Sequence, residues 1–172
     1  MGGDHGPTVV VQGAAAAVRE FGASVILVGD RDAIEREITR LHVASLNMEI
    51  RHASQVVGMA ESPSQALRRK RDSSLRVAAE LVRDGHASAF ISAGNTGAAM
   101  AIAMFVIGVL RGIDRPAIAT VLPSLKRATL LLDVGANVAP KPWHLFQFAL
   151  MGHAYANWKR CQGLGEIGRA HV

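Results

Sequence analysis

Apolar positions recur along the chain with two different periods. Short runs rich in Val, Ile and Leu that end at Gly, Asp, Ser or His predict β-strands. Longer segments with apolar residues three or four positions apart predict helices. The expected strands cover residues 24–28, 48–52, 87–92, 117–122 and 129–133. The expected helices cover residues 7–21, 31–41, 63–83 with a break near Asp72, 96–110 and 142–157.

The order of these segments predicts an α/β protein. Strands that alternate with helices form βαβ units, which give a mostly parallel sheet with helices on both faces, a three-layer α/β/α arrangement. In such sheets ligands bind beyond the carboxyl ends of the strands. The helix expected at 96–110 is apolar nearly all round, so we expect it to be central and buried. No repeat or linker divides the chain.

Several turns in this pattern combine Gly with Asp, Asn, Ser or His. They are MGGDHGP (1–7), GD (29–30), HASQVVGM (52–59), SAGNTGA (92–98) and DVGAN (133–137). Glycine allows close approach to the backbone, and a helix start offers free N–H groups that favour an anion by about 0.3–1 kcal/mol. These turns predict a shared oxyanion or phosphate site at one sheet edge, where Ser92, Asn95 and Thr96 would face Asp133 and Asn137. Ordinary turns and helix caps are the alternative.

Composition and charge narrow the partners. The 172 residues are 49% hydrophobic and carry a formal charge of +5, which favours a folded domain with anionic partners. Four cationic residues are consecutive in the sequence: Arg68, Arg69, Lys70 and Arg71. They form either a solvated helix face or a positively charged edge of the site that attracts an anionic substrate or an acidic protein. The single Cys161 excludes an internal disulfide and favours a reducing cytoplasm. The histidines show no metal-ligand spacing, so no metal site is expected, and GxGxxG and P-loop patterns do not occur.

Eight motifs in order carry a family resemblance. They are MGGDHGP, VGD, HASQVVGM, QALRRKRDSSLRVA, SAGNTGA, GIDRPAIATVLP, LLDVGAN and QFALMGHAYA. Together they resemble the PlsX family of phosphate acyltransferases over Met1–Ala156. The resemblance implies an α/β/α fold like that of isocitrate and isopropylmalate dehydrogenases. It also implies formation of acyl-phosphate from acyl-acyl carrier protein and inorganic phosphate, in bacterial phospholipid synthesis.

The same resemblance implies that the protein needs no cofactor and binds no nucleic acid. It also implies a homodimer that is cytoplasmic, either free or attached peripherally to the membrane. We expect four residues to be catalytic: Asp4, His5, Asn95 and Asn137. Six more are expected to bind phosphate or substrate: Gly3, Ser92, Gly94, Thr96, Gly97 and Lys141. Arg68, Arg69, Lys70 and Arg71 are expected to contact the acidic carrier protein. Asn95 stands at a Gly-flanked helix start, where packing gives little reason for Asn.

The chain also departs from this family. The family has an apolar strand before its first glycine-rich turn, and here the chain starts inside that turn. Residues 157–172 do not resemble the family, and the ending IGRAHV resembles a translated sequencing adapter, so we expect this tail to be artefactual. We also expect the fold to be incomplete at both ends and the chain alone to be inactive. Two alternatives stay open: a phosphate acetyl- or butyryltransferase that uses acyl-coenzyme A, and a non-enzymatic basic module that binds an acidic protein or a membrane surface.

Overall fold

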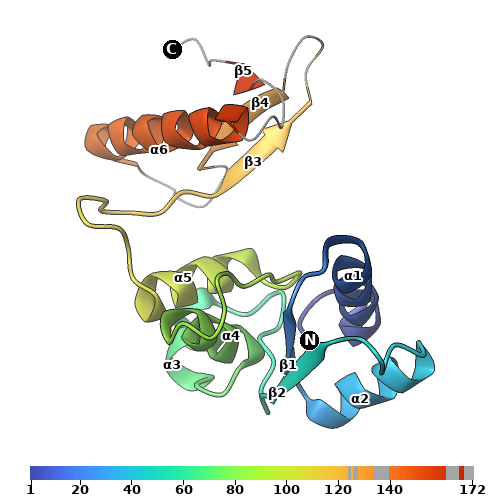
Figure 1. Cartoon of the computed structure of the whole chain (residues 1–172). Coiled ribbons are helices and arrows are strands. Elements are labelled where there is room, and N and C mark those ends of the chain that lie inside the picture. The colour runs from blue at the N-terminus through green and yellow to red at the C-terminus, as the bar shows by residue number, and fades with distance from the viewer. Residues whose placement is uncertain (124, 126–127, 134–139, 162–166, 169–172) are drawn as a thin grey trace. The chain divides into compact units, whose positions relative to one another are not determined.

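A computed structural model describes residues 1–123, 125, 128–133, 140–161 and 167–168. The chain divides into two compact units, Met1–Gly108 and Val109–Val172, and each is described by itself (Figure 1). No helix among the described residues is both long and apolar enough to cross a membrane.

The first unit is an α/β unit built around a parallel pair of strands. Its elements are α1 (Gly6–Phe21), β1 (Val25–Gly29), α2 (Arg31–Arg40), β2 (Met48–His52), α3 (Pro63–Arg69), α4 (Ser74–Arg83) and α5 (Thr96–Val106). β1 and β2 run parallel, with Val25 opposite Met48 and Gly29 opposite His52. α2 connects the two strands, as the alternating pattern predicted.

Two hydrophobic clusters hold this unit together. The first joins α1, α2 and β1, and its buried members are Val11, Ala15, Leu27, Ile34 and Val43. The second joins the helices α3, α4 and α5, which lie beside one another in Figure 1; its buried members are Val57, Ala66, Leu75, Ala79, Ala98, Ile102 and Val106. Ala98, Ile102 and Val106 are four residues apart, so they form one stripe along α5. A fully buried side chain such as Ile102 contributes about 1.5–3 kcal/mol to stability.

Local chemistry explains where the helices begin and end. Asp30 caps α2, because its Oδ1 accepts a hydrogen bond from the Ala33 N–H at 2.8 Å. α1 has a Pro in its first turn and ends at Gly22, whose φ of 63° is the left-handed conformation that closes helices. The expected break near Asp72 is confirmed, since α3 ends at Arg69 and α4 starts at Ser74.

The second unit packs one long helix with a small sheet. β3 (Ala119–Leu122) and β4 (Ala128–Leu132) pair antiparallel, β5 (Ile167–Gly168) runs parallel to β4, and α6 covers Pro142–Cys161. Within this unit the buried Gln147 of α6 fixes the preceding loop: its amide donates to the Gly112 carbonyl at 3.0 Å and accepts from the Asp114 N–H at 3.1 Å.

Three expectations from the pattern were wrong. Residues 87–92 form no strand, and Ile91 is 98% exposed. An apolar run becomes a strand only where a neighbouring strand accepts and donates its backbone hydrogen bonds. α5 ends at Val106, not at residue 110, and Gly108 follows with a φ of 92°. Phe105 is 67% exposed, so α5 buries one stripe and not its whole circumference.

The α/β class is confirmed by the parallel pair and its helices. The antiparallel pairing of β3 with β4 was not predicted. The three-layer arrangement like that of isocitrate dehydrogenase stays a prediction.

Candidate functional site

Three of the glycine-bearing segments predicted from the sequence meet in the first unit. We call them the N-terminal turn (residues 1–6), the 56–61 loop and the 92–95 turn. A Cβ atom at Gly2 would lie 2.5 Å from the Val57 carbonyl oxygen, and one at Gly3 would lie 3.0 Å from the Ala93 carbonyl oxygen. A Cβ at Gly94 would lie 3.6 Å from the carbonyl carbon of Gly2. The segments therefore pack backbone against backbone, and the contact at Gly2 leaves no room for a Cβ atom.

The polar residues expected here lie on these adjoining segments. Asp4 and His5 are exposed on the N-terminal turn, just before α1. Ser92 accepts a hydrogen bond from the Gly94 N–H at 3.1 Å, and Thr96 is exposed at the start of α5. Gly97 lies against α3, because a Cβ there would meet Pro63 Cγ at 3.0 Å. Exposed carboxylate, imidazole and hydroxyl groups thus lie on segments whose backbones pack closely.

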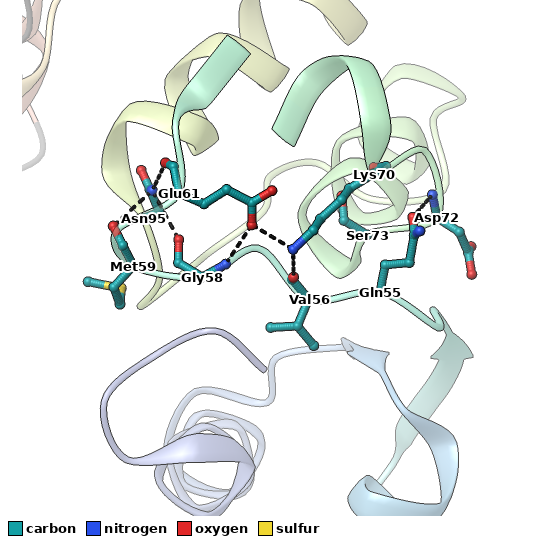
Figure 2. Close-up of polar contacts among 9 residues, drawn as sticks. All are labelled: Gln55, Val56, Gly58, Met59, Glu61, Lys70, Asp72, Ser73 and Asn95. Atoms are coloured by element: carbon teal, nitrogen blue, oxygen red, sulfur yellow. Dashed lines mark hydrogen bonds and ion pairs between the residues drawn. The ribbon is translucent and has the colours of Figure 1, made fainter. Parts of the chain in front are cut away.

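Asn95 occupies a different environment from its neighbours. It is only 8% exposed, and its Oδ1 caps α5 by accepting from the Ala98 N–H at 2.9 Å. Its Nδ2 lies 3.2, 3.0 and 2.8 Å from the carbonyl oxygens of Gly58, Met59 and Glu61, as Figure 2 shows. Both ends of the amide therefore bind the protein's own backbone. Packing does require Asn here, which the sequence did not indicate.

An ion pair lies on the other side of the same loop (Figure 2). Lys70 Nζ is 2.5 Å from Glu61 Oε2 and also donates to the Val56 carbonyl. The same carboxylate oxygen accepts from the Gly58 N–H at 3.2 Å. The hydrogen bond from Lys70, and then the one from Gly58, lowers the pKa of Glu61 below its usual range. Glu61 was not predicted as a functional residue, because no short motif links positions 61 and 70.

The base of this loop is joined to the start of α4. Gln55 and Ser73 form a parallel bridge, in which the Gln55 N–H donates to the Asp72 carbonyl at 3.0 Å. The Asp72 N–H donates back to Gln55 Oε1 at 3.0 Å. Hydrogen bonds from the Ser54 hydroxyl and N–H lower the pKa of the Asp72 carboxyl. Both ends of the 56–61 loop are thus held.

The four predicted cations divide into two groups. Arg68, Arg69 and Arg71 are exposed, and none forms an ion pair with another residue in the described part of the chain. Lys70 differs, because its ammonium group is used inside the fold. Arg68 and Arg71 line a surface hollow together with Arg76 and the apolar side chains of Leu67 and Phe105.

The remaining predicted residues belong to the second unit. Lys141 is exposed directly before α6, and its N–H donates to Nδ1 of the buried His144 at 3.1 Å. Asn137 lies outside the described residues. Asp133 follows β4 with a φ of 61°. The expected shared edge for Ser92 and Asp133 stays a prediction. Among the described residues no three His, Cys, Asp or Glu side chains gather to hold a metal ion.

Comparison with known proteins gives a consistent result. A family model described as "Fatty acid synthesis protein" matches residues 1–165. The phosphate acyltransferase of Oleidesulfovibrio alaskensis is 55% identical over 156 residues, which cover 91% of this chain and 45% of that protein. The phosphate acyltransferase of Pelobacter propionicus is 54% identical over 158 residues, 92% of this chain and 46% of that protein. The chain therefore spans about half the length of the curated relatives it matches.

Proposed function

Because the chain belongs to the fatty acid synthesis protein family, we propose that it forms part of a phosphate acyltransferase and contributes one wall of the active site. The observation that carries this proposal is the 55% identity to a phosphate acyltransferase over 91% of the chain. The convergence of three glycine-bearing segments with exposed Asp4, His5, Ser92 and Thr96 supports it.

The proposed reaction needs an anion site and an oxyanion site. An oxygen of inorganic phosphate attacks the carbonyl carbon of a thioester, and a C–O bond forms as the carbonyl becomes an oxyanion. When the intermediate collapses, the C–S bond breaks and the thiolate leaves, so the product is an acyl-phosphate. A single oxyanion donor is typically worth about 2.7–4 kcal/mol of barrier. N–H groups at the start of α5 and the hydroxyls of Ser92 and Thr96 are suitable donors.

We assign the other predicted residues as follows. Asp4 and His5 would orient the phosphate or move its proton, since carboxylates and imidazoles are the side chains that most often serve as general acids and bases. Gly3, Gly94 and Gly97 would permit the close packing around the anion. Asn137 and Lys141 would add further donors. Asn95 would act through the backbone that it holds.

The acyl donor we propose is acyl-acyl carrier protein. Exposed Arg68 and Arg71, beside the apolar Leu67 and Phe105, offer charge and apolar surface to an acidic protein. The pathway would be bacterial phospholipid synthesis, carried out by a cytoplasmic homodimer that associates peripherally with the membrane.

A chimera tests this function. The 156 matched residues of this chain replace the corresponding segment of the full-length Oleidesulfovibrio alaskensis enzyme. We expect phosphate-dependent consumption of acyl-acyl carrier protein, with acyl-phosphate as the product. Turnover of acetyl-coenzyme A alone would instead indicate a phosphate acetyl- or butyryltransferase. A folded chimera that binds carrier protein or anionic vesicles without any turnover would indicate a non-enzymatic binding module.

A further inference from the structure

We propose that Asn95 and Lys70 are positioning residues for this reaction, which clamp the 56–61 loop and so hold the N-terminal turn against the start of α5 (Figure 2). This proposal rests on the proposed function. It assigns Lys70, which the sequence grouped with three exposed arginines, to the scaffold of the site.

The first half of the clamp is the Asn95 amide. Three carbonyl groups of the loop, those of Gly58, Met59 and Glu61, point at the single Nδ2 atom. An amide nitrogen has two hydrogens, so one of them must be shared between two carbonyls. The loop therefore closes around one NH₂ group, while Oδ1 of the same side chain is fixed to the first turn of α5 by the Ala98 N–H. Asn95 thus couples the loop and the helix start directly.

The second half of the clamp is the ion pair. Glu61 turns back on its own loop to accept from the Gly58 N–H, and this places a carboxylate 20% exposed beside Lys70, 29% exposed. Lys70 neutralises that charge and also donates to the Val56 carbonyl. Without the ammonium group the loop would keep the carboxylate but lose its only described counter-charge. The Val57 side chain, buried in the α3–α5 cluster, anchors the loop between these contacts.

The clamp reaches the proposed anion site through the backbone. The Val57 carbonyl is the atom against which Gly2 packs, and Gly2 in turn lies against Gly94. Asp4 and His5 follow Gly2 by two and three residues, so displacement of the loop moves them relative to Ser92 and Thr96. Loss of the clamp should therefore change how the site holds phosphate, while the hollow lined by Arg68 and Arg71 includes neither Asn95 nor Lys70.

The test of the amide uses Asn95→Ser in the chimera defined above. Ser is also a preferred N-cap, so its hydroxyl keeps an acceptor for the Ala98 N–H, while the longer amide and its two-hydrogen NH₂ donor are lost. We expect the KM for inorganic phosphate to rise about tenfold, while the KM for acyl-acyl carrier protein stays within twofold. Ser62→Ala is the matched control, because its hydroxyl contacts only Ser64 among the described residues and bridges no segments; its kinetics should match the wild type.

The test of the ion pair uses Lys70→Met beside Arg69→Met. Both changes remove one positive charge from the same stretch, but only Lys70 is bonded to the loop. We expect Lys70→Met to raise the KM for phosphate and Arg69→Met to leave it within twofold. Hydrogen exchange should also rise at residues 56–61 in Lys70→Met and Asn95→Ser, but not in the two controls.

The outcomes separate this proposal from the proposed function. If the wild-type chimera folds but has no phosphate-dependent turnover, the proposed function fails. If it is active and both clamp variants keep the wild-type KM for phosphate at a matched folded fraction, the positioning role is overturned. An equal rise in the KM for phosphate in Lys70→Met and Arg69→Met would also overturn it, since that result would assign the effect to net charge.

Discussion

At the scale of single residues, Asn95 shows that a polar side chain suited to bind a substrate can instead bind the protein's own backbone. The sequence places an amide beside two glycines at a helix start, which is compatible with substrate contact. The structure directs Oδ1 to Ala98 and Nδ2 to three loop carbonyls. The partners lie 34 to 37 residues earlier in the chain, so no local pattern could have revealed them.

This environment predicts a large stability effect for Asn95→Ala. Loss of an N-cap typically costs about 1 kcal/mol, and loss of the part-buried hydrogen bonds to the loop carbonyls adds about 0.5–1.5 kcal/mol. We expect the free energy of unfolding, measured by urea denaturation, to fall by about 1.5–2.5 kcal/mol. Asn95→Ser should lose less, because it keeps the cap. Equal losses in both variants would show that the amide donors contribute nothing.

Glu61 predicts a specific acid dependence. Its pKa is lowered in the folded state, by the hydrogen bond from Lys70 first, from an ordinary value of 4.5. A carboxylate with a lowered pKa stabilises the fold above its unfolded pKa, and this stabilisation is lost as the pH falls through the folded value. The stability difference between wild type and Glu61→Gln should therefore shrink from pH 7 to pH 3 in thermal melts. A constant difference would contradict the ionic role.

At the scale of elements, helices were predicted better than strands. α2 and α5 start where Asp30 and Asn95 cap them, as the sequence indicated, and β2 covers the predicted residues. These signals are local. A strand also needs a hydrogen-bonded neighbour, and residues 87–92 have none in the described part of the chain. The exposed face of α5 was missed for a related reason, because composition alone does not indicate which side meets another helix.

The contact between the N-terminal turn and the 56–61 loop predicts opposite effects for two Gly→Ala changes. Gly2→Ala would place a Cβ 2.5 Å from the Val57 carbonyl oxygen, and overpacking of this kind costs about 1–3 kcal/mol. Gly13 lies within α1 with nothing within 4 Å of its Cβ position, so Gly13→Ala should stabilise by about 0.5–1 kcal/mol. Denaturant midpoints measure both. Similar shifts in the two variants would argue against the close approach at Gly2.

At the scale of the whole molecule, the exposed arginines predict how the proposed carrier protein would be recruited. In the chimera, Arg68→Ser with Arg71→Ser should raise the KM for acyl-acyl carrier protein at low salt. This effect should diminish toward 0.5 M salt, because charges are screened over about 10 Å at 0.1 M and less above that. Arg19→Ser is the control, because Arg19 is an exposed cation on α1 that does not line the hollow. Glu61→Gln would not serve, since it alters the clamp. A salt-independent rise in KM would indicate a structural role for the two arginines.

The last prediction concerns the 172-residue chain assayed alone. It aligns with 45% of the length of its Oleidesulfovibrio relative, and large apolar side chains are exposed in both units, among them Phe105, Trp143 and Phe146. Apolar surface of this kind usually marks contact with other protein. We therefore expect the chain to show no phosphate-dependent consumption of acyl-acyl carrier protein under conditions in which the chimera is active.

The measurement is a side-by-side assay at equal folded concentration. Turnover within about tenfold of the chimera, a difference of about 1.4 kcal/mol in barrier, would mean that these two units hold the whole active site and that their exposed apolar faces serve another purpose.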